Sequence, residues 1–406
     1  MRLVDKLRKI SAPSPNASPA LHLQPRASLG SMPLPGEQVE GELGAFWVRR
    51  TRLPPDHVHG RWTVGELRET RLDLLADVAR DPRFKQSIGL EDAIFFDTET
   101  TSLGGGVSTY VFLMGAGYFE GDSFVVEQYF LREVPEERAL LHAIRERLQG
   151  FGLVVSFHGK GFDAPRISGR LAFHRMGFEL TGPHLDLCQV GRSLYRGAFG
   201  NCRLQTFERR LVDFHRADDL PGAECPRAFF SHLQGDSSLI PRVFEHNLFD
   251  VLTLPAVAAS FSSELADPRH PVVLANLGSL HESAGRDAPA RTSYLEALEG
   301  LRADRHALLP RALERLALLE RRAGRHAESA RLLHERIEIT PYAFQPLEDL
   351  AKYYEHHAHE PERAEVIAVD ARSRLLTGKI SVDSQSRLRC LRSLDHRLAR
   401  LRRRIG

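Results

Sequence analysis

The chain has 406 residues, 42% of them hydrophobic, and a formal net charge of +2 at pH 7. This length is enough for two or three domains, and the nearly balanced charge excludes a globally basic field as a sign of a nucleic-acid partner. The four cysteines form no C-x-x-C pair, which argues against structural zinc and for a reducing compartment. The basic N-terminal stretch is followed by no apolar core, and no apolar run approaches membrane-spanning length. We therefore expect a cytoplasmic protein without a membrane partner.

The first ninety residues divide into two segments. Residues 1–38 are rich in Pro, Ser and Ala without periodicity, which predicts a disordered lead. Residues 39–90 contain a possible strand, GAFWVRRTRL, and a helical apolar spacing in TVGELRETRLDLLADVAR. We interpret this segment as a small mixed extension packed on the main domain.

The main domain is predicted over residues 91–266. It opens with the apolar run AIFFDTETTS, followed by STYVFLMGAGYF and SFVVEQYFL, and a Glu-Gly-Asp hairpin signal separates the last two. Pro135 begins a predicted helix that Gly150 ends, and LVVSF at 153–157 is a further buried strand. Helices are also predicted at 204–211 and 242–261. A three-strand meander followed by alternating helices and strands indicates an α/β fold.

Past residue 267 the sequence is typical of helices only. Leu-Gly or Leu-Ala pairs recur at 277–278, 316–317 and 350–351, and the turn Ala-Gly-Arg at 284–286 returns at 323–325. Small residues follow about fourteen positions after each start, at Ala290, Ala330 and Ala364. The pattern resembles tetratricopeptide repeats, in which stacked helix pairs bury each other's apolar faces, and an ordinary helical bundle is the alternative. We assign the repeats to 267–380 and a basic helix or tail to 381–406, whose eight arginines either contact phosphate or form a solvated helix face.

Two acids follow the first apolar run of the main domain. Asp97 and Glu99 are two residues apart, so on a strand their side chains point the same way. Two carboxylates this close repel each other unless a cation lies between them or one is protonated. Taken alone, the pair favours a surface strand end with two solvated acids.

Further acids follow later elements. Asp163 comes after the strand at 153–157, where it is either part of a site or a helix cap. His246 and Asp250 are four residues apart, which places them on one face of a helix. Asp250 alone would be an ordinary surface acid of that helix.

Together, FFDTETTSLGGG, SFHGKGFDAPRI, HLDLCQVGRSLYR and VFEHNLFDVLTL resemble the DEDD exonuclease superfamily of the ribonuclease-H-like fold, and most closely its YprB-type branch with appended tetratricopeptide repeats. The resemblance covers about residues 91–261. It implies a two-metal phosphodiester hydrolase in which Asp97, Glu99, Asp163 and Asp250 hold two Mg²⁺ or Mn²⁺ ions about 4 Å apart, with Asp97 as the bridging ligand. Hard cations take oxygen ligands, which agrees with four acids.

The same resemblance implies that His246 is the general base. Members with a histidine base usually place it five residues before the last Asp, whereas this chain has it at the four-residue spacing of the tyrosine members. The alternative is that His246 orients water or substrate.

Several residues are candidates for weaker roles. Thr100, Gly104, His158 and Lys160 are the candidate substrate contacts, and the alternatives are a tight turn for the glycines 104–106, a turn cap for His158 and an exposed loop for Lys160. Asp186 is either structural or an outer support for the metal site. We interpret 217–241 as an excursion beside the cleft, where Arg227, Phe229 and Phe230 either stack on nucleic acid or, for the phenylalanines, pack in the core.

We therefore predict a divalent-metal-dependent exonuclease that trims single-stranded nucleic acid from a 3′ end, the polarity being implied by the resemblance. The alternative is a scaffold whose helical repeats bind a protein partner while a silent nuclease-like domain grips nucleic acid. The sequence leaves DNA against RNA open, because recognition of the 2′-hydroxyl depends on pocket detail.

Overall fold

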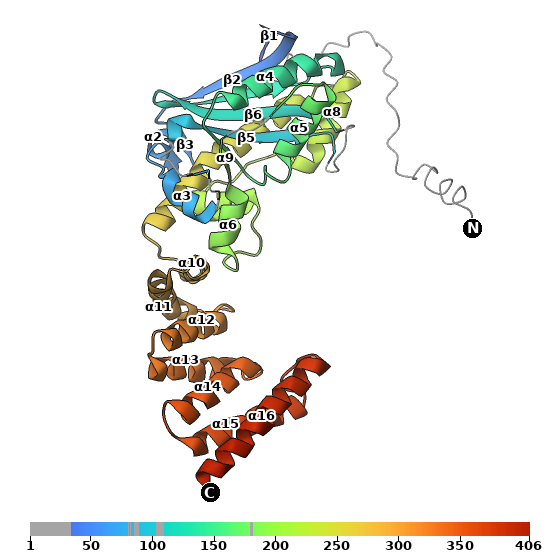
Figure 1. The fold of residues 1–406 in the computed structure, drawn as a ribbon. Helices are drawn as coiled ribbons and strands as arrows, with labels where there is room; N and C mark the ends of the chain where they lie inside the picture. The colour runs from blue at the N-terminus through green and yellow to red at the C-terminus, as the bar shows by residue number, and fades with distance from the viewer. Residues whose placement is uncertain (1–33, 80, 82, 85–88, 103–108, 179–181) are drawn as a thin grey trace, which may run out of the picture.

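The computed structural model describes residues 34–79, 81, 83–84, 89–102, 109–178 and 182–406. It has a mixed α/β part followed by a column of helices (Figure 1). The strands are β1 (Glu37–Gly41), β2 (Gly44–Leu53), β3 (Val58–His59), β4 (Trp62–Thr63), β5 (Ala93–Thr100), β6 (Val111–Glu120), β7 (Ser123–Phe130), β8 (Leu153–Ser156) and β9 (His184–Asp186). The helices of the α/β part are α2 (Val64–Leu67), α3 (Leu72–Ala79), α4 (Glu137–Gln149), α5 (Asp163–Phe173), α6 (Leu187–Tyr195), α7 (Leu204–Phe207), α8 (Cys225–Leu233) and α9 (Ile240–Ala266). Short 3₁₀ turns lie at η1 (Leu90–Asp92), η2 (Val134–Glu136) and η4 (Gly222–Glu224), and a π turn lies at η3 (Glu208–Val212).

Seven strands form one sheet in the order β1-β2-β7-β6-β5-β8-β9. β5, β6 and β7 pair antiparallel as the predicted meander, and β8 and β9 join β5 in parallel. The α/β fold class predicted for this part is confirmed. β5 lies inside the sheet between β6 and β8, and helices cover both faces of the sheet, so its apolar run is buried.

The N-terminal segment differs from the predicted extension. β1 begins at Glu37, within the predicted lead, and β2 pairs antiparallel with β7 along Trp47–Leu53. These strands therefore continue the main sheet. The physical reason is that β7 would otherwise be an edge strand with unpaired backbone groups, and the ten-residue strand β2 supplies their partners.

Two apolar cores lie on the two faces of the sheet. One contains Phe95 with the second half of α9 and with α3 and α6, and the other contains Phe96 with α4, α5, α8 and the first half of α9. Alternation along β5 sends the two phenylalanines to opposite faces. The expectation that no apolar run approaches membrane-spanning length is wrong for α9, which by length and composition is apolar enough to cross a membrane. Most of that stretch is buried in this domain, and core packing accounts for it.

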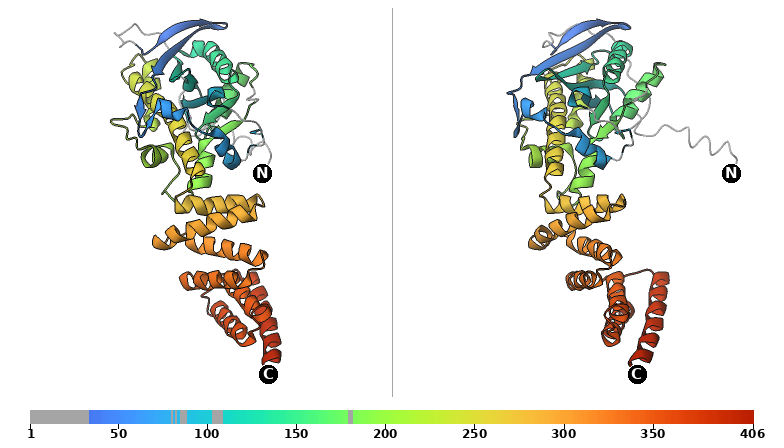
Figure 2. Two further views of the ribbon diagram at one scale, coloured as in Figure 1. Left: turned by 90° about the vertical axis from the view of Figure 1, so that its left-hand side faces the viewer. Right: turned by 60° about the vertical axis from the view of Figure 1, so that its left-hand side comes forward.

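The remaining helices stack below the sheet (Figures 1 and 2). They are α10 (Pro271–Ser283), α11 (Asp287–Ala303), α12 (Leu309–Arg322), α13 (His326–Ile339), α14 (Phe344–His356), α15 (Pro361–Leu376) and α16 (Ser384–Ile405). Consecutive helices pack as pairs from α10 to α15, and α16 packs on α15. Asn276 on α10 joins this column to the end of α6 by donating to the carbonyls of Leu194 and Arg196, at 2.9 and 3.1 Å.

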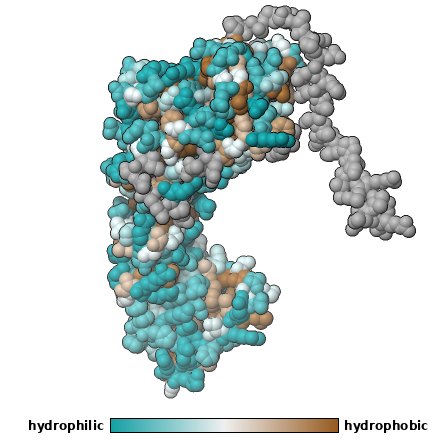
Figure 3. All heavy atoms as spheres, turned by 45° about the horizontal axis from the view of Figure 1, so that its top comes forward, coloured by the Kyte–Doolittle hydropathy of each residue, from teal (hydrophilic) through white to brown (hydrophobic). Residues whose placement is uncertain are grey.

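The recurring positions predicted from the sequence lie where helices cross. Leu316, Ala317, Leu350 and Ala351 are buried, as are the three spaced alanines. A buried glutamate also recurs near the end of the first helix of each pair, at Glu282, Glu320 and Glu355, and each pairs with at least two arginines. The periodicity thus corresponds to paired helices, and the tetratricopeptide class stays a prediction. The surface in Figure 3 is hydrophilic over most of the face in view, with smaller apolar patches.

The α16 helix is amphipathic. Leu394 and Leu398 pack in a buried cluster with residues of α15, and Leu401 is also buried. Arg397 and Arg400 reach Glu355. Arg392 and Arg403 lie on the exposed side. Part of the basic segment at 381–406 therefore serves internal ion pairs.

The close contact between α9 and β6 depends on Gly115. A Cβ atom at this position would lie 2.3 Å from Oδ1 of Asn247 and 2.6 Å from a methyl group of Val251. We expect Gly115→Ala to lower the free energy of unfolding by about 1–3 kcal/mol, because overpacking forces α9 away from the sheet. Gly169→Ala on α5 is the matched control, since nothing lies within 4 Å of its Cβ position, and helix propensity should raise stability by up to about 1 kcal/mol. Urea unfolding of both variants measures this, and equal effects would contradict the account of this contact.

Candidate active site

The end of β5 presents two carboxylates to α9. Asp97 and Glu99 alternate with Thr98, so they point to one side of the strand while Thr98 points to the other. Glu99 and Thr98 are buried, and Asp97 is half-buried. A bulge between Glu99 and Thr100 ends the regular pairing with β6 at this point.

Helix α9 brings the last acid to these two. Carboxylate oxygens of Asp97, Glu99 and Asp250 all lie within 4.8 Å of one another, and we call these three residues the acidic triad. Asn247 lies on α9, one turn before Asp250, and donates from Nδ2 to Oδ2 of Asp97 at 3.2 Å. Gln128 on β7 donates to Asn247 Oδ1 at 3.0 Å and so fixes the orientation of that amide. The helix is thereby attached to the first carboxylate by a hydrogen bond.

Asp163 lies beside the triad. It is the first residue of α5 and is buried, and its Oδ1 accepts a hydrogen bond from the Thr98 hydroxyl on the opposite side of β5. Its oxygens are not among those within 4.8 Å of the triad. Its charge nevertheless acts on Asp97 and Glu99, whose pKa values it helps to raise. The structure therefore gathers three of the four predicted acids and places the fourth in their electrostatic neighbourhood.

Burial and mutual repulsion dominate the electrostatics. Burial and then Asp250 raise the pKa of both Asp97 and Glu99 well above the ordinary range. Burial also raises the pKa of Asp163 to about 6, although its hydrogen bond from Thr98 works the other way. Carboxylates held together in a low-dielectric site favour the charged form only when a cation joins them.

His246 points one ring nitrogen into the triad and the other away from it. Nε2 lies 3.3 Å from Asp250 Oδ2 and 3.8 Å from Glu99 Oε1. Nδ1 lies 2.8 Å from Asp219 Oδ1. Arg216 Nη1 also lies 3.5 Å from Nδ1, so both ring nitrogens have charged neighbours. In the tautomer whose proton lies on Nδ1, Asp219 accepts that proton and the Nε2 lone pair faces the triad. The four-residue spacing of His246 and Asp250 is thus compatible with a histidine that faces the site.

A buried arginine holds this arrangement from behind. Arg216 Nη2 lies 2.5 Å from Asp250 Oδ1 and 2.8 Å from Glu208 Oε2, and Nη1 lies 3.1 Å from Asp219 Oδ2. Its side chain is 5% exposed. Burial works against the guanidinium charge, but Asp250 and Glu208 raise the pKa of Arg216 further. Arg216 is thus a fixed cation that binds one oxygen of the last acid.

Sequence reasoning missed Glu208, Arg216, Asp219, Asn247 and Cys225. The available signal was a polar run, Arg-Ala-Asp-Asp at 216–219, shortly before the last motif. Within the excursion at 217–241, the sequence pattern indicates Arg227, Phe229 and Phe230 instead. Of those, Arg227 has an 80% exposed side chain, whereas Phe229 is buried and stacks on Phe112 with centroids 4.5 Å apart. Phe229 therefore packs in the core.

The candidate substrate contacts are placed as follows. Thr100 donates its hydroxyl to the Ser102 carbonyl at 3.1 Å, and Gly104 lies outside the described residues. His158 has a φ of 67°, and its N–H donates to Asp186 Oδ1 at 2.8 Å. Lys160 Nζ lies 3.8 Å from Asp81 Oδ2.

Asp186 is the N-cap of α6 and accepts backbone hydrogen bonds from His158, Lys160 and Cys188. It therefore fixes the turn that leads into Asp163, which agrees with the structural interpretation.

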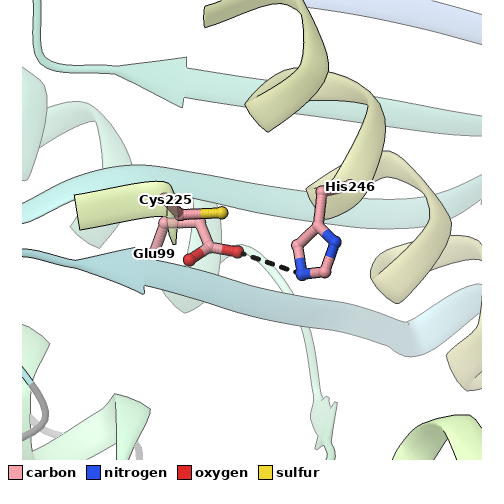
Figure 4. A group of neighbouring side chains, drawn as sticks. All are labelled: Glu99, Cys225 and His246. Atoms are coloured by element: carbon pink, nitrogen blue, oxygen red, sulfur yellow. Dashed lines mark ion pairs between the residues drawn. The ribbon is translucent and has the colours of Figure 1, made fainter. Parts of the chain in front are cut away.

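The donor set of the triad fits a hard divalent cation. Asp97, Glu99 and Asp250 offer only carboxylate oxygens, the ligands that Mg²⁺ and Mn²⁺ prefer. The raised pKa values of the two strand acids indicate a site that gains stability when positive charge enters it. Figure 4 shows the Glu99 carboxylate facing the His246 ring, with the Cys225 thiol beside it.

Residues 94–261, which contain the acidic triad and most of β5 and α9, match the RNase_H superfamily. This part of the chain is an RNase H superfamily domain. The chain is also 28% identical over 226 residues to the Bacillus subtilis (strain 168) protein YprB, which is itself uncharacterized; the match covers 55% of this chain and 54% of YprB. The chain thus spans about half the length of this curated relative. The superfamily suggests a nuclease that uses divalent metal ions.

Burial of Asp163, together with burial and mutual repulsion of Asp97 and Glu99, predicts how stability depends on pH. Without divalent cations, we expect the free energy of unfolding to fall by about 1–3 kcal/mol between pH 4 and pH 7. The pKa of Asp163 is about 6 in the folded protein and near 3.9 in an unfolded chain. The folded state therefore holds protons that the unfolded state has released, and its stability decreases as they leave. Urea unfolding over this range in the presence of a chelator measures the slope.

Asp97→Asn removes one repelling charge and should flatten that slope, making the variant more stable than the parent at pH 7. Asp92→Asn, at an exposed position just before β5, is the control and should keep the parental slope. Mn²⁺ at 100 times its Kd should stabilise the parent by about 2.7 kcal/mol and the Asp97 variant by much less. A slope that Asp97→Asn leaves unchanged would contradict this electrostatic account.

Proposed function

We propose that this protein is a divalent-metal-dependent exonuclease that hydrolyses phosphodiester bonds of single-stranded nucleic acid from the 3′ end. The observation that carries the proposal is the acidic triad, with His246 Nε2 directed into it. The order of the four acidic motifs, which resembles that of DEDD exonucleases, supports the exonuclease assignment and the polarity.

Asp97, Glu99, Asp163 and Asp250 would hold the divalent ions, Mg²⁺ or Mn²⁺. When bound, such ions supply an activated water and stabilise charge on the leaving oxygen. Asp97 is the central ligand in this proposal, because it lies on the strand between Asp250 and the side of β5 that faces Asp163. Two of these acids are held in place by uncharged partners, since Asn247 donates to Asp97 and Thr98 donates to Asp163.

His246 would accept the proton of the attacking water at Nε2. The proposal requires the neutral tautomer with its proton on Nδ1, where Asp219 would accept it and leave the Nε2 lone pair free. Asp219 would also stabilise the imidazolium that forms after proton transfer. Arg216 keeps Asp219 in place by an ion pair. Asp219 is therefore a positioning residue that acts through the ring.

Removal of the central acid tests the proposal. We expect Asp97→Asn to reduce cleavage of single-stranded substrate by more than about 100-fold, because a ligand to the ions is lost. Asp92→Asn should cleave at the parental rate. The assay uses single-stranded DNA and RNA labelled at either end, with Mg²⁺ or Mn²⁺. A 5′ label should yield a ladder that shortens stepwise, and a 3′ label should be released at once as a mononucleotide. A parent that is as inert as Asp97→Asn under all these conditions would refute the proposal.

The tautomer argument predicts a separate effect. We expect Asp219→Asn to lower kcat by about 10–100-fold while leaving KM within about twofold, because the amide can donate to Nδ1 and so place the proton on Nε2. His246→Ala should lower kcat at least as much. Asp218→Asn, whose side chain is 94% exposed, is the neighbouring control. If KM rises and kcat stays at the parental value in Asp219→Asn, the residue acts on substrate binding instead.

A further inference from the structure

A second group of possible ligands overlaps the acidic triad. One ligand atom each of Glu99, Cys225 and His246 lies within 4.8 Å of the other two, and all three residues are buried (Figure 4). Cys225 is the first residue of α8, directly after the η4 turn, and its Sγ supplies the sulfur of this group. The three residues come from β5, α8 and α9, so the fold itself brings them together. We call this group the mixed-donor group.

The mixed-donor group differs from the triad in the chemistry of its ligands. It offers one sulfur, one imidazole nitrogen and one carboxylate oxygen, whereas the triad offers oxygens alone. Mg²⁺ and Mn²⁺ favour oxygen, but Zn²⁺ and Co²⁺ readily take thiolate, imidazole and carboxylate together. Three protein ligands with a fourth position open to water is a common zinc arrangement.

The orientation of the histidine matches that of a metal ligand. His246 Nδ1 is bound to Asp219 at 2.8 Å, and a histidine that ligates through one nitrogen commonly donates from the other to a carboxylate. Nε2 lies 3.8 Å from Glu99 Oε1. A nitrogen and an oxygen that ligate one tetrahedral zinc ion are about 3.4 Å apart, so a small movement of either side chain would bring both onto one ion. Gly222 leaves room beside this nitrogen, because a Cβ atom there would lie 3.3 Å from Nε2.

The Cys225 thiol is fully buried and lies beside Glu99 and His246. A zinc-class cation would bind the thiolate, and the thiol proton would be released to solvent. Mg²⁺, which binds thiolate poorly, would leave the proton in place.

We propose that Glu99, Cys225 and His246 bind one Zn²⁺ ion, and that this ion inhibits the nuclease by taking two residues that hydrolysis requires. Glu99 is shared between the two groups, and the bound Nε2 of His246 can no longer accept a proton. The binding claim stands on the ligand geometry alone, whereas the inhibition rests on the proposed function.

Cobalt spectroscopy tests the binding directly. Co²⁺ replaces Zn²⁺ in such sites, and a bound thiolate gives it an ultraviolet ligand-to-metal charge-transfer band. We expect the full chain, freed of metal by a chelator, to develop this band on addition of one equivalent of Co²⁺ and to lose it when Zn²⁺ is added. Cys225→Ser should show no band, because serine is close to cysteine in size but has no sulfur. Cys390→Ser on α16 should keep it. A parent without the band, or a Cys225 variant that retains it, would overturn the proposal.

A nuclease assay tests the inhibition. With Mg²⁺ at a fixed saturating concentration, micromolar Zn²⁺ should inhibit the parent, and Cys225→Ser should need at least about tenfold more Zn²⁺ for half-inhibition. Equal sensitivity of the two proteins to Zn²⁺ would overturn the inhibitory role. If neither protein cleaves nucleic acid even without Zn²⁺, the proposed function fails, and the cobalt band still decides whether the mixed-donor group binds metal.

Discussion

Repulsion among buried carboxylates is the constraint on which the rest of this site depends. Asp97, Glu99 and Asp250 are held within reach of one ion, and both strand acids have raised pKa values because burial and their neighbours oppose ionisation. Such a cluster costs free energy in the absence of a counter-charge. The protein must therefore hold it together by other contacts until cations bind.

Those contacts come from two directions. On the sheet side, Asn247 connects α9 to Asp97, and this requires the close approach that Gly115 permits. On the far side, Arg216 binds Asp250 and connects it through Asp219 to the histidine. Arg216 binds Oδ1 of Asp250, so the other oxygen, Oδ2, faces Nε2 of His246 in the triad. Asn247 and Arg216 thus hold the carboxylates of Asp97 and Asp250 in place. Because Arg216 and Asp219 lie between α7 and α8, that segment is part of the site.

Much of this could be predicted from the sequence because it depends on local pattern. The buried run before Asp97 predicts the central strand, and the four-residue spacing predicts that His246 and Asp250 share a helix face. The order of the acidic motifs predicts the superfamily, which the comparison with known proteins confirms. The repeat of Leu-Gly and Leu-Ala pairs correctly predicts positions that are buried where helices cross.

The remainder depends on tertiary contacts that have no short-range signal. Arg216 is 34 residues from Asp250, and Cys225 is 126 residues from Glu99, so no spacing rule connects them. The absence of a C-x-x-C pair argued against structural zinc, but it could not reveal a single cysteine brought by the fold to a histidine and a glutamate. The place of β2 in the main sheet has no local signal for a similar reason. β2 joins the sheet because β7 would otherwise be an unpaired edge strand, and the sequence of β2 does not contain that information.

The most direct test of the central claim is anomalous diffraction from crystals of the full chain soaked in Mn²⁺. The account predicts an anomalous peak within bonding distance of Asp97, bounded by Glu99 and Asp250, and its loss in Asp97→Asn crystals. Mn²⁺ bound elsewhere with no peak between these three acids would contradict it.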